Sequence, residues 1–579
     1  MSRARRRPAR RGAPIIVALA AGLATMSILP ASAQQPLEPD RIDVVQAPGS
    51  LGPADAAARV DFDLVLADRD PAAFDRFRAA LYDPASPDYR RFLTPQQIGE
   101  RFGPTDATLD QVRAAVASAD LTVVSVPPQR SRMSVSGTAA AASAFLGVTI
   151  ERWQDPGSGL AYHATTGSPA VPAALADAVI AVEGLSPVLP ASAVDPADAP
   201  PVPARGLTPP DLARAYDFQS LWDQGIDGTG TTVGILQFGV DTDEDLAVFD
   251  AAFGIEGPTP IRVPIDGGLE DAPAKFGTEA ALDTQVVRAV APGTQIIVYG
   301  FPATTSFGAA MDAIVTDGRT QLVSVSYGKC YAAGYVGLDE VLGTQEALKD
   351  AAAAGISLFA ASGDWGAYSC HTFDNTDHRV STFFPACTDN VVSVGGTLLE
   401  LNADGTYKRE TGWEDYLVTG GTGGGVASVN GPDGPLEQLP PYQQGYPGVE
   451  QSVTGRFCPD VAAVADGDTG YLLFETSQET GEPGWKMVGG TSGAAPFWAG
   501  VMALIQQKAQ AEGVTQLGFL TPLFYQLAQS HPQAFHDIVR GGNLLHDAGP
   551  GWDAATGVGT PIVSVLADAV IETLQGGGG

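Results

Sequence analysis

Histidine is scarce in this chain of 579 residues, which contains only six. They are His163, His371, His378, His531, His536 and His546. None of them stands in a Gly-His pair directly after a predicted strand, and His163 falls in a segment that we expect to be removed. Serine hydrolases of the Ser-His-Asp type, which work at neutral pH, use a histidine as general base. The scarcity therefore argues against that kind of chemistry.

Basic residues are also few. Lys and Arg number 33 against 66 Asp and Glu, which gives a formal net charge of −33. Such a charge is repelled by nucleic acid and by anionic lipid, so we expect neither as a partner. At low pH the carboxylates take up protons and the repulsion disappears, so the composition suits an acid-stable protein. General solubility is the alternative explanation of the same charge.

Long apolar runs are absent except near the N-terminus. There, six arginines between positions 3 and 11 precede an apolar run from Ile15 to Leu29, followed by Ala31-Ser32-Ala33. This order is typical of a signal peptide, and the run is too short to predict a membrane span. We assign residues 1–33 to the signal and expect a secreted protein, extracellular or periplasmic, without membrane attachment after cleavage.

Cysteine is rare and confined to the second half of the chain. The four residues are Cys330, Cys370, Cys387 and Cys458. In an exported protein four cysteines can form two disulfides in three different pairings. The sequence does not choose among these pairings.

Prolines mark a division of the chain. Six of them recur between 187 and 203 without apolar periodicity, which predicts an extended and cleavable linker over 186–206. Residues 34–185 before it combine an alternating strand at 60–66, a helix at 109–116 and strands at 121–126, 132–136 and 147–152, so they form an α+β domain. After it, 207–579 alternates apolar strands (232–238, 295–299, 322–325, 356–360) with helices, which indicates an α/β fold with a mostly parallel sheet.

A serine in the segment Gly490-Thr491-Ser492-Gly493 precedes an apolar helix at 497–505. A hydroxyl at such a glycine-rich turn is expected to be exposed, and the positive end of the helix favours an oxyanion beside it. Ser492 is therefore a candidate nucleophile. A turn with a helix cap is the alternative reading.

Three carboxylates are candidates for the proton chemistry that histidine does not supply. Glu279 and Asp283 are four residues apart on a predicted helix that Thr278 can cap, so they share a face and titrate as a unit. Asp364 follows a buried strand at 356–360, and catalytic groups of α/β sheets gather at the carboxyl ends of strands. A solvated helix face and an Asx turn are the structural alternatives.

These motifs, taken in order, resemble the sedolisin family of serine-carboxyl peptidases. The resemblance covers the chain from about Leu207 to its end. The matching segments are Glu279 with Asp283, 324–328 (Ser-Val-Ser-Tyr-Gly), 362–364 (Ser-Gly-Asp), 384–386 (Phe-Pro-Ala), 394–397 (Val-Gly-Gly-Thr), 456–462 (Arg-Phe-Cys-Pro-Asp-Val-Ala) and 490–492 (Gly-Thr-Ser).

The resemblance implies a subtilisin-like catalytic domain after a ferredoxin-like propeptide that inhibits it, with 84–105 matching the family's propeptide. It also implies roles for the four candidates. Ser492 would attack the peptide carbonyl, Glu279 would accept its proton, Asp283 would tune Glu279, and a protonated Asp364 would donate to the oxyanion. Glycines 423–425 and the strand around Ser326 would bind the substrate backbone. We expect a monomeric endopeptidase acting on proteins or peptides, with tripeptidyl-peptidase activity as a further option.

The resemblance further implies one calcium ion near the C-terminus. Calcium prefers six to eight oxygen ligands. The corresponding positions are the carboxylates of Asp537 and Asp553 and the backbone carbonyls of Ile538, Gly549 and Gly551. Two ordinary Asx turns are the alternative.

Two positions depart from the family pattern. Gln237 stands where kumamolisin-like members carry a glutamate that extends the proton network, and Tyr327 replaces a tryptophan. These changes give weight to a rival hypothesis, a catalytically weakened secreted binding protein on a peptidase fold. A second rival, a neutral subtilisin-type protease, lacks a suitable histidine.

Overall fold

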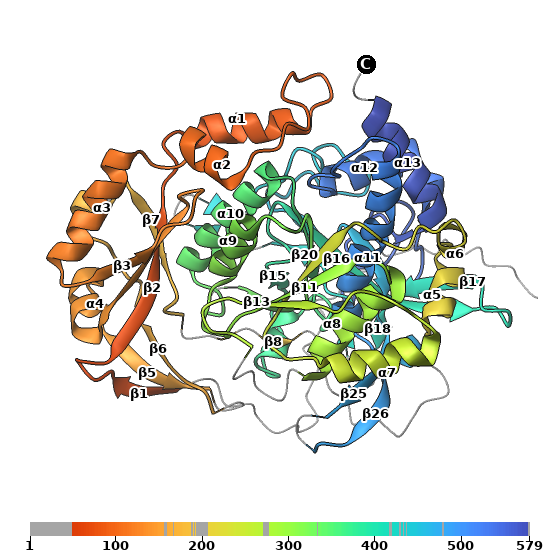
Figure 1. Cartoon of the computed structure of the whole chain (residues 1–579), viewed down its shortest axis with the longest axis horizontal. Helices are drawn as coiled ribbons and strands as arrows, with labels where there is room; N and C mark the ends of the chain where they lie inside the picture. Colours follow the sequence, from red (N-terminus) through yellow and green to blue (C-terminus); the bar gives the residue numbers. More distant parts are fainter. Residues whose placement is uncertain are drawn as a thin grey trace, which may run out of the picture. The chain divides into compact units, whose positions relative to one another are not determined.

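The computed structural model describes residues 49–155, 159–165, 167–186, 189, 191–192, 206–269, 277–332, 334–415, 420–427, 430–431, 434–435, 437–477 and 480–576 (Figure 1). These residues fall in one compact unit. The predicted signal peptide and most of the predicted linker lie outside them. No helix in the described ranges is long and apolar enough to cross a membrane.

The N-terminal part is an α+β domain, as the sequence predicts. Its four-stranded antiparallel sheet has the order β3-β4-β2-β7. The strands and the helices packed on them are β2 (Arg59–Leu66), β3 (Thr122–Ser125), β4 (Arg132–Thr138), β7 (Val179–Glu183), α3 (Asp106–Ser118) and α4 (Ala139–Leu146). Alternate apolar residues of β2 are buried against apolar residues of α3, which closes the core of this domain.

Three further strands and two helices complete the N-terminal domain. They are β1 (Gly49–Pro53), β5 (Ile150–Gln154), β6 (Ala161–Thr165), α1 (Pro71–Leu81) and α2 (Pro95–Arg101). The strands form a separate antiparallel sheet. Phe74 and Phe77 of α1 are buried with Phe102 and with Ala353 of the C-terminal domain, so this helix joins the two domains through apolar contact.

The C-terminal domain is built on an eight-stranded sheet of order β10-β11-β9-β12-β14-β16-β17, with β24 also paired to β16. Its strands are β9 (Thr232–Gln237), β10 (Ile261–Pro264), β11 (Gln295–Gly300), β12 (Leu322–Val325), β14 (Ser357–Ala361), β16 (Val391–Leu401), β17 (Tyr407–Gly412) and β24 (Val461–Val464). Every pair is parallel except β16 with β17. The predicted α/β class is therefore confirmed.

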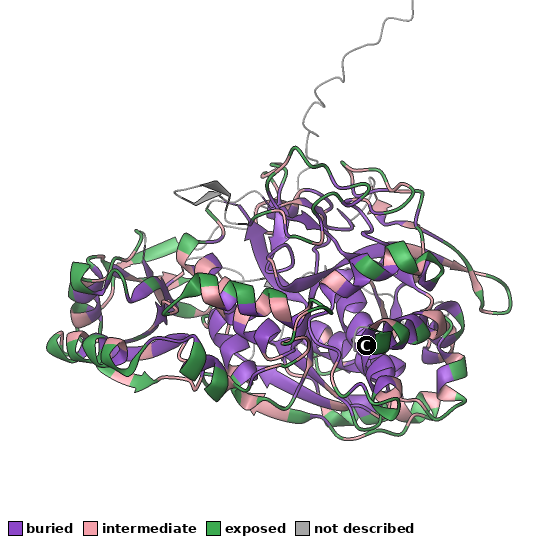
Figure 2. Cartoon of the chain, turned by 90° about the horizontal axis from the view of Figure 1, so that it is seen from above, coloured by how far each residue is buried: buried purple, intermediate pink, exposed green. Residues whose placement is uncertain are grey.

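Helices cover both faces of this sheet, so successive residues of a strand are buried on opposite sides. Ile235 packs with α8 (Gly277–Val290) and α11 (Thr491–Ala511). Leu236 packs with α9 (Phe307–Asp317) and α10 (Leu338–Ala353). The described part of this domain also contains α5 (Pro209–Ala215), α6 (Gln219–Trp222), α7 (Asp243–Phe253), α12 (Thr521–Ser530) and α13 (Val563–Gly576). Figure 2 shows the central sheet and its helices as the most deeply buried region.

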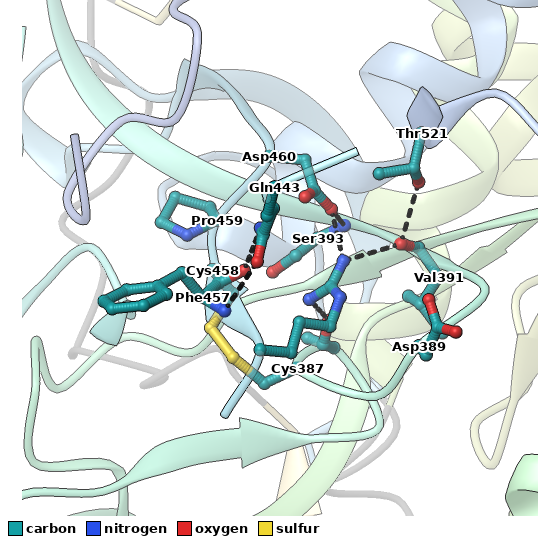
Figure 3. Close-up of polar contacts among 12 residues, drawn as sticks. Cys387, Asp389, Val391, Ser393, Gln443, Phe457, Cys458, Pro459, Asp460 and Thr521 are labelled. Atoms are coloured by element: carbon teal, nitrogen blue, oxygen red, sulfur yellow. Dashed lines mark hydrogen bonds and ion pairs between the residues drawn. A yellow bond between two sulfur atoms is a disulfide. The ribbon is translucent and has the colours of Figure 1, made fainter. Parts of the chain in front are cut away.

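The structure selects one of the three cysteine pairings, Cys330–Cys370 and Cys387–Cys458, with Cα–Cα separations of 4.7 and 5.6 Å. The second disulfide lies beside a buried polar cluster (Figure 3). There, the side-chain amide of Gln443 bonds both the N–H and the carbonyl of Phe457, and Asp460 accepts the Ser393 N–H at 2.8 Å. These contacts fix the start of β24 beside β16.

Candidate active site

Ser492 is the second residue of α11 (Thr491–Ala511), two residues after the glycine that turns the chain into the helix. Gly490 has a φ of +108°, a conformation that side chains disfavour, so glycine is required there. Ser492 itself is 0% exposed. The expectation of an exposed hydroxyl was therefore wrong for this full-length chain, since the serine is covered by the surrounding elements.

A proline four residues later frees the main-chain carbonyl of Ser492. Pro496 has no N–H, so it cannot donate the helical hydrogen bond that the Ser492 carbonyl would otherwise accept. That carbonyl instead accepts from the hydroxyl of Ser326, at 3.1 Å. In return, the Ser492 hydroxyl donates to the main-chain carbonyl of Ser326 at 3.4 Å. Ser326, which follows β12, thus holds the nucleophile candidate from two sides.

Glu279 and Asp283 lie one turn apart on α8, and both are buried, with 2% and 0% exposure. The solvated-face alternative is therefore excluded. Burial raises the pKa of Asp283 well above its ordinary value, and the neighbouring Glu279 raises it further. Thr278 lies inside the helix, which already includes Gly277, so the prediction that it caps the helix was wrong.

The hydroxyl of Ser326 also lies 2.6 Å from Asp283 Oδ1. This hydroxyl has one proton, so it cannot donate to Asp283 and to the Ser492 carbonyl together. If Asp283 carries a proton, it donates to Ser326, and Ser326 is free to donate to Ser492. The protonation of Asp283 is thereby connected to the position of the serine's main chain.

Asp364 follows β14 and reaches the residue before the serine. Its Oδ1 accepts from the Thr491 N–H at 2.8 Å and from the Thr491 hydroxyl at 2.7 Å. It is only 5% exposed. Its carboxyl therefore lies at the N-terminus of α11 beside Ser492, and the Asx-turn alternative does not describe it.

A short strand from the linker is paired beside these residues. β8 (Ala191–Ser192) runs antiparallel to β13 (Tyr327–Tyr331), with Ser192 opposite Tyr327 and Ala191 opposite Gly328. In the N-to-C direction β8 runs toward Ser326. The predicted edge pairing around Ser326 is thus made by the chain's own linker. Two of the glycines at 423–425, which were expected to bind the substrate backbone, make contacts within the chain. The Gly423 N–H donates to the Gly363 carbonyl, and Gly425 pairs with Cys458 in an antiparallel ladder.

One arginine anchors the N-terminal domain on α9. Arg132 is buried and pairs with Asp312 of α9 and, at 2.6 Å, with Glu183 of β7. Two glycines make room for this group: a Cβ at Gly308 would lie 2.9 Å from the Arg132 guanidinium, and one at Gly343 would lie 2.3 Å from the Glu183 carboxyl carbon. We call Arg132, Glu183 and Asp312 the arginine clasp.

Two of the predicted calcium ligands, Asp537 and Asp553, both contact one loop near the C-terminus. Asp537 accepts from the Gly551 N–H at 3.0 Å, and Asp553 accepts from the Gly549 N–H at 3.1 Å. No cluster of three or more His, Cys, Asp or Glu side chains suited to a metal occurs in the described ranges. The predicted site needs only two such side chains, with carbonyls completing it. Asp553 also accepts from the N–H groups of Ala555 and Thr556, as the Asx-turn alternative predicts. The carboxylate oxygens of Asp537 and Asp553 are of the kind that calcium prefers.

The sequence analysis did not single out the side chains of two buried residues near the site, Ser326 and Asp241. Ser326 belongs to a matched motif, but its bridging position depends on contacts between distant segments. Asp241, four residues after Gln237, is 6% exposed and accepts from the Gln237 amide at 3.4 Å. Its position after a strand end was the available signal.

Comparison with known proteins gives a consistent result for both domains. Residues 49–188 match the model described as "Pro-kumamolisin, activation domain", and residues 276–522 match the "Subtilase family". The chain is 33% identical over 472 residues to kumamolisin from Bacillus sp., covering 76% of this chain and 78% of that protein. It is 29% identical to sedolisin from Pseudomonas sp., over 86% of this chain and 85% of the relative, and 28% identical to bovine tripeptidyl-peptidase 1, over 88% and 92%.

Among solved structures, Pseudomonas sedolisin in complex with pseudo-iodotyrostatin is similar, with a TM-score of 0.54 and 27% identity. The match covers 65% of this chain and all of that one. The fold and the two family matches define a subtilisin-like serine peptidase preceded by an activation domain. The chain belongs to the sedolisin family of serine-carboxyl peptidases. Its N-terminal domain is an intramolecular inhibitor, and its two disulfides fit an extracellular or lysosomal protease.

Proposed function

We propose that this peptidase is exported as a precursor, matures in acid, and cleaves peptide bonds within proteins with Ser492 as nucleophile. The observation that carries the proposal is the meeting of Asp364, Ser326 and Asp283 around the start of α11. Each contributes a group of the kind that acyl transfer requires. A histidine base has no part in it.

In this mechanism Glu279 accepts the proton of Ser492 as the hydroxyl attacks the scissile carbonyl, and Asp283 tunes the proton affinity of Glu279. Asp364, in its protonated form, donates a hydrogen bond to the tetrahedral oxyanion beside the Ser492 N–H. The proton on Glu279 then passes to the leaving amine. In the second half of the reaction Glu279 takes a proton from a water molecule that attacks the acyl-enzyme. Glu279 then returns this proton to the Ser492 oxygen as the acyl bond breaks and the carboxylic acid product leaves. An ionised Asp364 would repel the oxyanion, so the reaction requires acid.

The linker supports the proposal that the precursor processes itself. β8 occupies the edge of β13 in the manner of a substrate strand, and the chain continues upstream of it into the N-terminal domain. A strand edge that pairs with such an internal segment suits an endopeptidase. Leu207 bonds Gly470 and Leu472 through its main chain, so we place the maturation cuts between Ser192 and Leu207.

We also propose that the loop with Asp537 and Asp553 holds one calcium ion, together with the carbonyls of Ile538, Gly549 and Gly551. The convergence of two carboxylates on this loop supports it. When bound, calcium would supply electrostatic stabilisation of the loop, far along the sequence from the nucleophile. It takes no part in the chemical steps.

The experiment that tests the function measures kcat/KM against pH for the matured enzyme. Ser492→Ala and Glu279→Gln should abolish turnover, since the first lacks the nucleophile and glutamine cannot accept its proton. Asp364→Asn should cost on the order of 10²- to 10³-fold, as for other oxyanion donors. Its activity should extend to higher pH, because an amide donates at every pH. Turnover retained by Ser492→Ala would refute the proposal.

A further inference from the structure

A hairpin outside the central sheet contacts both helices that carry the proposed catalytic residues. It consists of β25 (Tyr471–Thr476) and β26 (Pro483–Val488). β26 leads within four residues to Ser492. At the start of β25, the ring of Tyr471 rests on α11 beside the nucleophile, since a Cβ on Gly493 would lie 2.3 Å from this ring. Both ends of the hairpin are thus fixed relative to Ser492.

The same hairpin holds α8 at two points. The side-chain amide of Gln285 donates to the Phe474 carbonyl at 2.7 Å, and its oxygen accepts the Phe474 N–H at 2.9 Å. Nearer the start of the helix, the ammonium of Lys486 donates to the hydroxyl of Thr278 at 3.3 Å. Thr278 and Gln285 are seven residues apart, about two helical turns, so they lie on one side of α8. The hairpin therefore supports this side of the helix from its first turn onward.

Lys486 is itself held by a carboxylate of the neighbouring strand. It pairs with Glu475 of β25 at 3.0 Å, and the side chains are 27% and 6% exposed. A lysine stem is flexible, so this pair fixes the direction in which the ammonium points. The first turn of a helix has N–H groups without helical partners and frays readily. Thr278 and Glu279 both belong to that turn of α8.

We propose that Lys486 is a positioning residue that fixes Thr278, and with it Glu279, relative to the nucleophile. The inference rests on the proposed function, because it takes Glu279 as the base for Ser492. Proton transfer requires the two groups to come within hydrogen-bond reach. A displacement of about 1 Å can cost on the order of a hundredfold in rate. A contact that keeps the first turn of α8 in place therefore acts on the chemical step.

The test measures kcat and KM separately for variants of the full-length chain matured in acid. Thr278→Val removes the hydroxyl, keeps the shape and leaves the pair of Lys486 with Glu475 intact. This variant and Lys486→Met should lower kcat by up to on the order of a hundredfold. KM should change little, because neither residue belongs to β13, the strand that pairs with β8. Thr278→Ser keeps the hydroxyl and should retain the kcat of the parent.

The matched control is Lys408→Met. Lys408 pairs with Glu400 across two strands at 2.7 Å, but its side chain is 50% exposed and touches neither α8 nor α11 in any printed contact of that pair. This variant should keep the kcat of the parent.

A double variant separates positioning from general stability. Residues that act through one contact are not additive, so Lys486→Met combined with Thr278→Val should have the same kcat as Lys486→Met alone. The role of Lys486 is overturned if Thr278→Val keeps the parent kcat, if Thr278→Ser loses as much as Thr278→Val, or if the losses multiply in the double variant. Turnover retained by Ser492→Ala or Glu279→Gln in the same series would instead overturn the proposed function.

Discussion

Replacing Arg132 by methionine should release the inhibitory domain from the catalytic domain. The side chain is 5% exposed, and its partners Glu183 and Asp312 are 0% and 2% exposed. Methionine keeps most of the length but removes the cation. While the domains stay together, the Asp312 carboxylate then stays buried without its ionic partner and keeps only the donors Gln129 and Ser131. When they separate, that carboxylate regains water. The substitution therefore penalises the closed state of the precursor.

Removing one partner of a buried ion pair costs about 3–5 kcal/mol, which corresponds to roughly a hundredfold to a few thousandfold in the opening equilibrium. The assay follows hydrolysis of a fluorogenic peptide by the full-length precursor at neutral pH, with gel analysis to show that it is uncut. Arg132→Met should raise this residual activity by up to that factor. It should also speed maturation in acid.

Arg130→Met is the matched control, since Arg130 pairs with Asp106 and the Pro104 carbonyl inside the N-terminal domain and is 25% exposed. It should leave residual activity close to that of the parent. If Arg132→Met and Arg130→Met precursors show the same activity before cleavage and the same maturation rate, the arginine clasp does not hold the inhibitor.

Three further outcomes are expected. Burial raises the pKa values of Asp68 and Glu183 to about 7, so the folded precursor binds protons that the unfolded chain has released above about pH 4.5. The melting temperature of the Ser492→Ala precursor should therefore fall from pH 5 to pH 8 in calorimetry, and Asp68→Asn should flatten this fall; a parallel decline in both would contradict the assignment. A chelator should lower the melting temperature of the mature enzyme with little change in kcat, because a ligand bound only by the folded form stabilises it. Asp553→Ala should remove the chelator's effect. Identical melting with and without calcium would refute the site. Gly343→Ala should speed maturation, because its Cβ would lie 2.3 Å from the Glu183 carboxyl carbon, and kcat/KM of the matured enzyme should equal that of the parent.

Local patterns in the sequence predicted the parts of the molecule that local forces determine. The strands at 232–238 and 322–325 agree with β9 and β12 to within one residue because both are short apolar runs buried on two faces. The four-residue spacing of Glu279 and Asp283 places them on one helix face whatever surrounds the helix. The α/β class and the division into two domains could also be predicted before the structure, because apolar strands that alternate with helices and a proline-rich linker are local features of the sequence.

Contacts between distant segments could not be predicted in this way. The disulfide Cys387–Cys458 spans 71 residues, and its formation depends on β16 and β24 lying side by side. The burial of Ser492 and its bond to Ser326 join residues 166 apart. Asp241 gave only a weak signal, because an aspartate after a strand is common and its partner Arg262 belongs to another strand.

Because we propose that substrates pair with β13, the pairing of β8 with that strand implies that the linker and a substrate would compete for one strand edge. While the chain is intact, the linker competes at an effective concentration on the order of millimolar, as tethered segments do. A cut between Ser192 and Leu207 would end the tether. After the cut, the degree of inhibition would depend on the bulk concentration of the released domain. Dilution after export would then activate the enzyme without any change in its structure.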